Sequence, residues 1–231
     1  MGKTEAYHQA LAQMADWDAY LRRESGLPGR RGNLELAEAA ADLAQPDRIG
    51  RYAALTPDQA PENTPDGFLA FCGVLGLGRL LSEGRLSALA ELRWHASDPR
   101  WRIREAVAMA LQRYGDHDME ALLAAMREWA QGAPLEQRAV VAALCEPRLL
   151  WQEHHATQVL CLLDGITASL AQAPDRSTEP FRVLRQGLAY GWNVAVAALP
   201  QTGKPLIEGW FVCADRDVRW LMRENLRKSR L

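Results

Sequence analysis

The chain has 231 residues, 48% of them hydrophobic and 24% charged, which is ordinary for a globular protein with one large domain or a short helical solenoid. Its formal net charge of −2 argues against a dedicated, strongly basic nucleic-acid binder. No apolar run approaches the ~20 residues that a membrane span needs, and the N-terminus shows no apolar signal core. We therefore expect a cytoplasmic protein that does not contact a membrane.

Helical spacing of apolar residues dominates the chain, and no segment sustains the alternation typical of a strand. A first helix is expected over residues 4–25. Asn33 is expected to cap a helix over 34–43, and Thr64 one that continues to residue 81. Gly73, Gly76 and Gly78 within this last helix suggest that backbones approach closely there. Further helices are expected near 85–96, 99–114, 116–131, 134–145, 148–173, 179–199, 203–213 and 215–229.

A motif of the later helices recurs within the chain. At an offset of 117, the segment Leu89-x-Glu91-x-x-Trp94-x-x-x-Asp98 matches Leu206-x-Glu208-x-x-Phe211-x-x-x-Asp215. The helices that follow these segments align at an offset of 115, which places Ile103-Arg104 on Val218-Arg219, Val107 on Met222 and Leu111 on Leu226. An offset of 117 equals three periods of about 39 residues, which is a usual length for a helical repeat. The alignment predicts that Leu111 and Leu226 are both buried.

The run from Ile103 to Leu111, closed by Tyr114-Gly115-Asp116, resembles the second helix of a HEAT repeat. The region 85–231 as a whole resembles the HEAT and HEAT-like superfamily, which includes protein-interaction scaffolds, bilin-lyase-related repeats and bacterial alkylpurine DNA glycosylases. The resemblance implies an all-α fold, an α-solenoid of about five or six antiparallel helix pairs whose second helices line a concave face. Residues 1–84 are expected to form an N-terminal helical cap or degenerate repeats, continuous with the HEAT-like repeats of 85–231 as one domain.

The candidate binding residues lie on the second helices of the two matching copies. They are Trp101, Arg102, Arg104, Arg219, Trp220 and Arg223. Arg104 and Arg219 either pair with an acidic group of a neighbouring repeat or face the groove, where they would bind a carboxylate or phosphate. Trp101 and Trp220 either stack on a base or a partner's aromatic ring, or, for Trp101, tuck under the preceding repeat. The basic run 227–231 is sufficiently explained by the dipole at a helix C-terminus.

The sequence predicts no catalytic residue, no metal site and no cofactor. The Asp116-His117-Asp118 run suits the first turn of a helix, and Glu153-His154-His155 lacks a second ligand pair at zinc-motif spacing. The glycosylase motif of adjacent tryptophans followed by an aspartate is not reproduced, so no catalytic residue is carried over. The four cysteines are widely spaced among apolar helical residues and are expected to be buried, reduced thiols.

Two functions remain open at this point. The first is a non-enzymatic scaffold that binds a protein partner along its concave face, which the near-neutral charge favours. The second is a DNA-binding or DNA-repair protein related to the HEAT-like glycosylases, which the clustered arginines and tryptophans favour. An enzymatic or lyase role is left as a third and weaker possibility.

Overall fold

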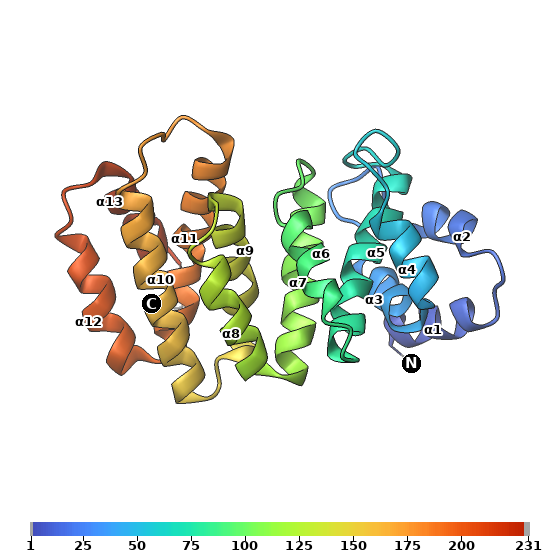
Figure 1. Ribbon diagram of the computed structural model, residues 1–231, viewed down its shortest axis with the longest axis horizontal. Coiled ribbons are helices and arrows are strands. Elements are labelled where there is room, and N and C mark those ends of the chain that lie inside the picture. Colours follow the sequence, from blue (N-terminus) through green and yellow to red (C-terminus); the bar gives the residue numbers. More distant parts are fainter. Residues whose placement is uncertain (1, 229–231) are drawn as a thin grey trace. The chain divides into compact units, whose positions relative to one another are not determined.

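The computed structural model describes residues 2–228, and the regular structure within that range is entirely helical. Thirteen α-helices and one short 3-10 helix follow one another without a strand in the described residues (Figure 1). The predicted all-α fold class is therefore confirmed. None of these helices is both long enough and apolar enough to cross a membrane.

The chain forms two compact units, Met1–Tyr114 and Gly115–Leu231. The first unit thus includes residues 85–114, which the sequence assigned to the repeats rather than to the cap. The division into a cap of 1–84 and repeats of 85–231 stays a prediction. The two units are described separately below.

The first unit is organised around one long buried helix, α5. Its helices are α1 (Lys3–Ala12), α2 (Trp17–Glu24), α3 (Leu34–Leu43), α4 (Pro46–Ala53), α5 (Pro65–Ser82), α6 (Ser87–His95) and most of α7 (Trp101–His117). Helix α5 packs against α2, α3, α4 and α6, and most of its residues are buried. The colours of Figure 1 show it in cyan-green among its neighbours.

Glycines let the backbones of α5 and its neighbours approach closely, as the sequence suggested. A Cβ atom at Gly73 would lie 2.3 Å from the backbone nitrogen of Ala53 in α4, and one at Gly78 would lie 2.5 Å from the carbonyl oxygen of Ala110 in α7. Both distances are far inside van der Waals contact, so only glycine fits these positions.

Local capping signals predicted some helix ends correctly and missed others. The side chain of Asn33 accepts a hydrogen bond from the N–H of Leu36, and that of Thr64 accepts one from Gly67, as expected for the two caps. The single helix expected over 4–25 is wrong. The chain breaks between α1 and α2, where the Asp16 side chain accepts from the N–H of Asp18 and starts a new helix.

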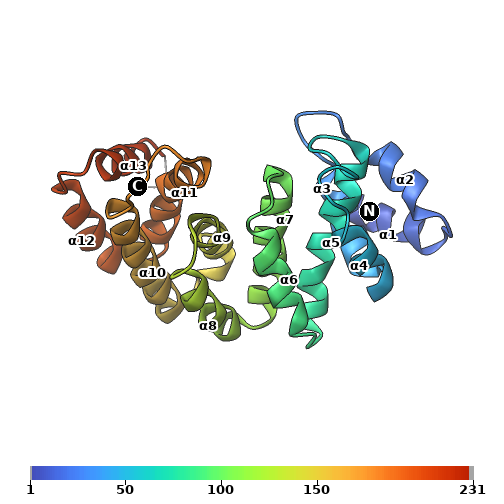
Figure 2. The ribbon, with the colours of Figure 1, turned by 45° about the horizontal axis from the view of Figure 1, so that its top comes forward.

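The second unit is built around α11. Its helices are α8 (Met119–Trp129), α9 (Pro134–Leu144), the 3-10 helix η1 (Pro147–Leu149), α10 (Glu153–Ala171), α11 (Glu179–Ala198), α12 (Pro200–Phe211) and α13 (Arg216–Leu226). Helix α11 packs against α9, α10, α12 and α13, and Figure 2 shows these helices in a second view. Its fully buried Trp192 donates from Nε1 to Thr167 of α10 at 3.0 Å.

The two leucines expected in the core behave differently. Leu111 is fully buried, as predicted, whereas Leu226 is 57% exposed. The prediction for Leu226 is wrong. The buried stripe of α13 runs through Val218, Leu221, Met222 and Asn225. The eight-residue spacing that buries Leu111 after Ile103 does not bury Leu226 after Val218, because Leu226 is the last residue of α13 whereas Leu111 lies in the middle of the longer α7.

Candidate functional site

The predicted residues of the first unit are largely occupied by internal contacts. Trp101 opens α7 and is 47% exposed, with the guanidinium of Arg102 4.5 Å from its ring. Arg102 itself is mostly buried. Its Nε lies 3.2 Å from Glu62 Oε1, and its Nη2 donates to the carbonyl of Gly29 at 2.9 Å. Trp101 is therefore available to a partner, whereas Arg102 holds two loops of its own unit.

Arg104 does not face solvent. Its side chain is buried, and its Nη1 donates to the carbonyls of Asp98 and Pro99 at 2.8 and 3.0 Å. These carbonyls belong to the turn between α6 and α7, so the guanidinium fastens that turn. Arg104 is thus held by contacts within its own unit, and its role as a binding residue stays a prediction.

The predicted residues of the second unit are more accessible. Arg219 and Arg223 of α13 are exposed. Trp220 is half-buried beneath the guanidinium of Arg185, which lies 4.3 Å from its ring and also pairs with Asp217. The six predicted residues thus fall into two groups, one in each unit. Residues 229–231 of the basic run lie outside the described residues.

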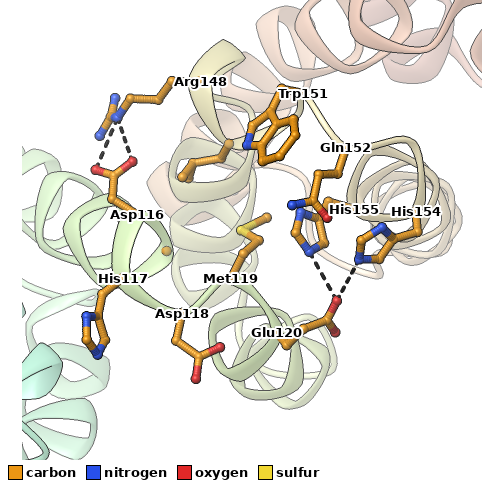
Figure 3. Close-up of a pocket in the computed structure, with 12 residues that line it drawn as sticks. Asp116, His117, Asp118, Met119, Glu120, Arg148, Trp151, Gln152, His154 and His155 are labelled. Carbon is orange, nitrogen blue, oxygen red and sulfur yellow. Dashed lines mark hydrogen bonds and ion pairs between the residues drawn. The ribbon is translucent and has the colours of Figure 1, made fainter.

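The second unit also contains a pocket that none of the six residues lines (Figure 3). Its volume is about 390 Å³. It lies where the end of α7, the start of α8, η1 and the start of α10 meet. The lining residues are Gly115, Asp116, His117, Asp118, Met119, Glu120, Arg148, Leu149, Trp151, Gln152, His154 and His155.

An apolar part of the pocket lies between two polar ends. Met119 and Leu149 are buried, whereas the indole of Trp151 is 78% exposed. The sequence places Trp151 between η1 and α10, in the short connection that leaves its side chain without a helix neighbour to cover it. We call this site the Trp151 pocket.

One polar end is an ion pair. The Nε of Arg148 lies 3.0 and 3.2 Å from the two carboxylate oxygens of Asp116, and Figure 3 shows both contacts. Because both side chains are close to half exposed, the pair is weakened by solvent. The lining contains two further carboxylates, Asp118 and Glu120, and no second guanidinium that would neutralise their charge.

The other polar end joins one carboxylate to two imidazoles. The Oε1 of Glu120 lies 2.8 Å from Nε2 of His154 and 3.1 Å from Nε2 of His155. The hydrogen bond from His154, followed by that from His155, lowers the pKa of Glu120 below its ordinary value. The His155 side chain is only 7% exposed and is therefore fixed by packing, whereas His154 and Glu120 are largely exposed.

Sequence reasoning treated the two halves of this pocket separately. Residues 116–118 and 153–155 were each interpreted as helix starts, and the Asp118 side chain does cap α8 by accepting from Ala121. The pocket arises because both helix starts lie together in space. The adjacent histidines, which begin three residues after a connecting tryptophan, were the one local signal available.

Comparisons with known proteins place the chain in no family. No family model matches it, and no curated protein matches it. Three of the solved structures that are similar to it are described here, all at low identity. One is described as the crystal structure of an engineered protein, with 13% identity, a TM-score of 0.43 and 98% of each chain covered.

The other two similar structures are designed armadillo repeat proteins, the second in complex with the peptide (KR)4. Their identities are 12% and 15% and their TM-scores 0.32 and 0.31, with 89% of this chain and 98% of each of theirs covered. These values are too low to carry an argument about what the present chain binds.

Proposed function

We propose that the chain is a non-enzymatic binding module for a protein partner and that the Trp151 pocket is a contact site for that partner. The observation that carries the proposal is the indole of Trp151, which is 78% exposed at the edge of a pocket whose lining also includes Met119 and Leu149. Tryptophan is among the residues most enriched at the energetic centres of protein interfaces.

Covering this indole would release substantial free energy. Burial of its exposed part removes about 150 Å² of mostly apolar surface from water, which corresponds to about 4 kcal/mol before the costs of association. Met119 and Leu149 provide an apolar surface beside it. A partner's apolar side chain would therefore fit between the indole and this surface.

The charge of the pocket indicates the kind of segment that would bind. Asp118 and Glu120 face the site, and the single lining arginine, Arg148, is already paired with Asp116. A net negative lining attracts Lys or Arg and repels phosphate. We propose a partner segment that offers an apolar side chain flanked by basic residues.

The alternative of DNA binding has less support. Of the four arginines that would contact phosphates, Arg104 is buried and Arg102 is bonded to Glu62 and to a backbone carbonyl. Only Arg219 and Arg223 are exposed. We expect random duplex DNA to bind no more tightly than about 10 μM at physiological salt.

We also propose a cytoplasmic location. The four cysteines are free thiols. The expectation that they are buried is correct for Cys72 and Cys145 and wrong for Cys161, which is exposed, and for Cys213, which is partly exposed. Accessible thiols persist most readily in a reducing compartment.

The test compares two exposed tryptophans. Wild-type chain, Trp151→Ala and Trp94→Ala are used to capture partners from a lysate of the native cell, and the affinity of the captured protein is then measured with purified components. Trp94 is the matched control because it is 69% exposed but belongs to the first unit. We expect Trp151→Ala to weaken binding at least about 30-fold, which corresponds to a loss of about 2 kcal/mol of binding free energy. Trp94→Ala should have little effect.

Equal binding by Trp151→Ala and the wild type would overturn the assignment of the pocket. Nanomolar, salt-sensitive binding of duplex DNA that Arg219→Ala together with Arg223→Ala abolishes would instead favour the DNA alternative. Circular dichroism of each variant shows that a loss of binding does not reflect a loss of fold.

A further inference from the structure

Glu120, His154 and His155 bring three metal-ligating atoms together at one end of the Trp151 pocket. Glu120 comes from the first turn of α8, and both histidines come from the first turn of α10. Their ligand atoms all lie within 4.8 Å of one another. Figure 3 shows the two imidazoles directed at the same carboxylate.

The distances between these atoms approach those of a zinc site. Ligand atoms at 2.0–2.1 Å from a tetrahedral Zn²⁺ lie about 3.3 Å from each other. The two Nε2 atoms lie 2.8 and 3.1 Å from Glu120 Oε1, and the three ligand atoms lie within 4.8 Å of one another, so the ion would enter if the carboxylate withdrew by a few tenths of an ångström and the exposed imidazole adjusted around it. The side chains that would have to move, Glu120 and His154, are 60% and 56% exposed and have room to do so.

The third ligand is held in place by the fold. The His155 side chain is 7% exposed, and its Nε2 is directed at the cluster. A fixed ligand reduces the entropy lost on coordination, because one of the three side chains is already ordered. The surrounding charge also favours a cation, since Asp118 lies in the same lining and Arg148 is engaged by Asp116.

We propose that Glu120, His154 and His155 form a binding site for a divalent transition metal that accepts imidazole and carboxylate ligands, with Zn²⁺ as the ion to be tested. Three protein ligands leave the fourth position of a tetrahedron open towards the pocket, where water or a group from another molecule coordinates. The site does not depend on the proposed protein partner, so either proposal can fail without the other.

The test is direct titration with Zn²⁺ of the purified full chain, without a polyhistidine tag and after treatment with a chelator. Calorimetry should show one ion per chain. Co²⁺ should give the visible absorption of a tetrahedral site without a thiolate charge-transfer band, since no cysteine belongs to the cluster. Glu120→Gln and His154→Ala should each weaken Zn²⁺ binding at least about ten-fold.

His117→Ala is the matched control, because His117 lines the same pocket but is not part of the cluster. Its affinity for Zn²⁺ should stay within about two-fold of the wild-type value, less than the ten-fold effect of a coordination-sphere change. The substituted ligands are exposed, so we expect these variants to fold, which circular dichroism checks. NMR of the wild-type imidazoles gives a readout that needs no variant: Zn²⁺ should shift the signals of two of the five histidines.

Three results would overturn the proposal. They are the absence of saturable binding of one ion, wild-type affinity in both Glu120→Gln and His154→Ala, and a thiolate band or shifts at other histidines. Any of these would leave Glu120 as a hydrogen-bond acceptor for the two histidines and nothing more.

Discussion

The buried ion pair between Asp98 and Arg100 should be the most sensitive polar contact of the first unit. Arg100 Nη2 lies 2.6 Å from Asp98 Oδ2, its Nε lies 2.9 Å from Oδ1, and the two side chains are only 4% and 2% exposed. Arg100 Nη1 also donates to the carbonyl of Ala60 at 3.0 Å, which ties the proline-rich loop to the α6–α7 turn.

Arg100→Met removes the charge while preserving most of the side-chain volume. In this variant the Asp98 carboxylate stays buried without the guanidinium and keeps the hydrogen bond from the N–H of residue 100. Loss of one partner from a buried pair costs about 3–5 kcal/mol. Because the chain has two compact units, native-state hydrogen exchange of peptides from α6 and α7 measures this loss where it occurs.

Arg22→Met provides the exposed counterpart in the same unit. Arg22 lies 2.7 Å from Asp66, and both side chains are more than 40% exposed, so its loss should cost less than about 1 kcal/mol. The double variant Asp98→Asn with Arg100→Met should be more stable than Arg100→Met alone, since no unpaired charge is then buried. If Arg100→Met and Arg22→Met destabilise equally, the reasoning from burial is refuted.

Three further predictions concern the same unit. Burial lowers the pKa of His95 from 6.5 to about 4, so the native state stays neutral while the unfolded state binds a proton. Stability is then lost as the pH falls from 6.5 towards 4, by about 2 kcal/mol at pH 5, and His95→Gln should flatten this dependence in denaturation measured at each pH. Gly78→Ala should destabilise by about 1–3 kcal/mol because its methyl would meet the backbone of Ala110, whereas Gly50→Ala, with no atom within 4 Å, should be neutral or stabilising. Leu111→Ala should cost about 2–5 kcal/mol in chemical denaturation, and a loss below about 1 kcal/mol would show that its burial matters little.

The features that the sequence predicted well depend on residues close together in the chain. The caps at Asn33 and Thr64 are formed with N–H groups three residues away, so the local signal is sufficient. Helix α4 escaped notice because it has only eight residues and its first residue, Pro46, looks like a break as much as a start. The burial of Leu226 was misjudged because the alignment with Leu111 does not show that α13 ends at residue 226.

The Trp151 pocket could not be predicted in the same way. Glu120 and His154 are separated by 34 positions, and they meet only because α8 and α10 pack together. A zinc motif can be recognised when both ligand pairs have fixed spacing within one helix or turn. Here one ligand comes from another helix, so the cluster has no signature along the sequence.

The two matching copies of the repeat motif agree at their aspartates and differ at their arginines. Asp98 Oδ1 accepts the N–H of residue 100 at 2.8 Å, and Asp215 Oδ1 accepts the N–H of residue 217 at 2.9 Å, so both aspartates shape the same kind of turn. Shaping this turn is a structural requirement of each copy, which explains why the aspartate recurs.

The arginines are not under the same requirement. In the first copy Arg100 pairs with Asp98, and Arg104 is buried against the turn. In the second copy the partner of Asp215 is Arg176, which comes from the connection before α11 and lies 2.6 Å away. Arg219, which aligns with the buried Arg104, is exposed. Alignment of the two copies therefore predicts the role of a residue only where the backbone of the turn requires that residue, as it does for the aspartate. A position that is buried in one copy and exposed in the other, such as that of Arg104 and Arg219, is one that a binding partner can use.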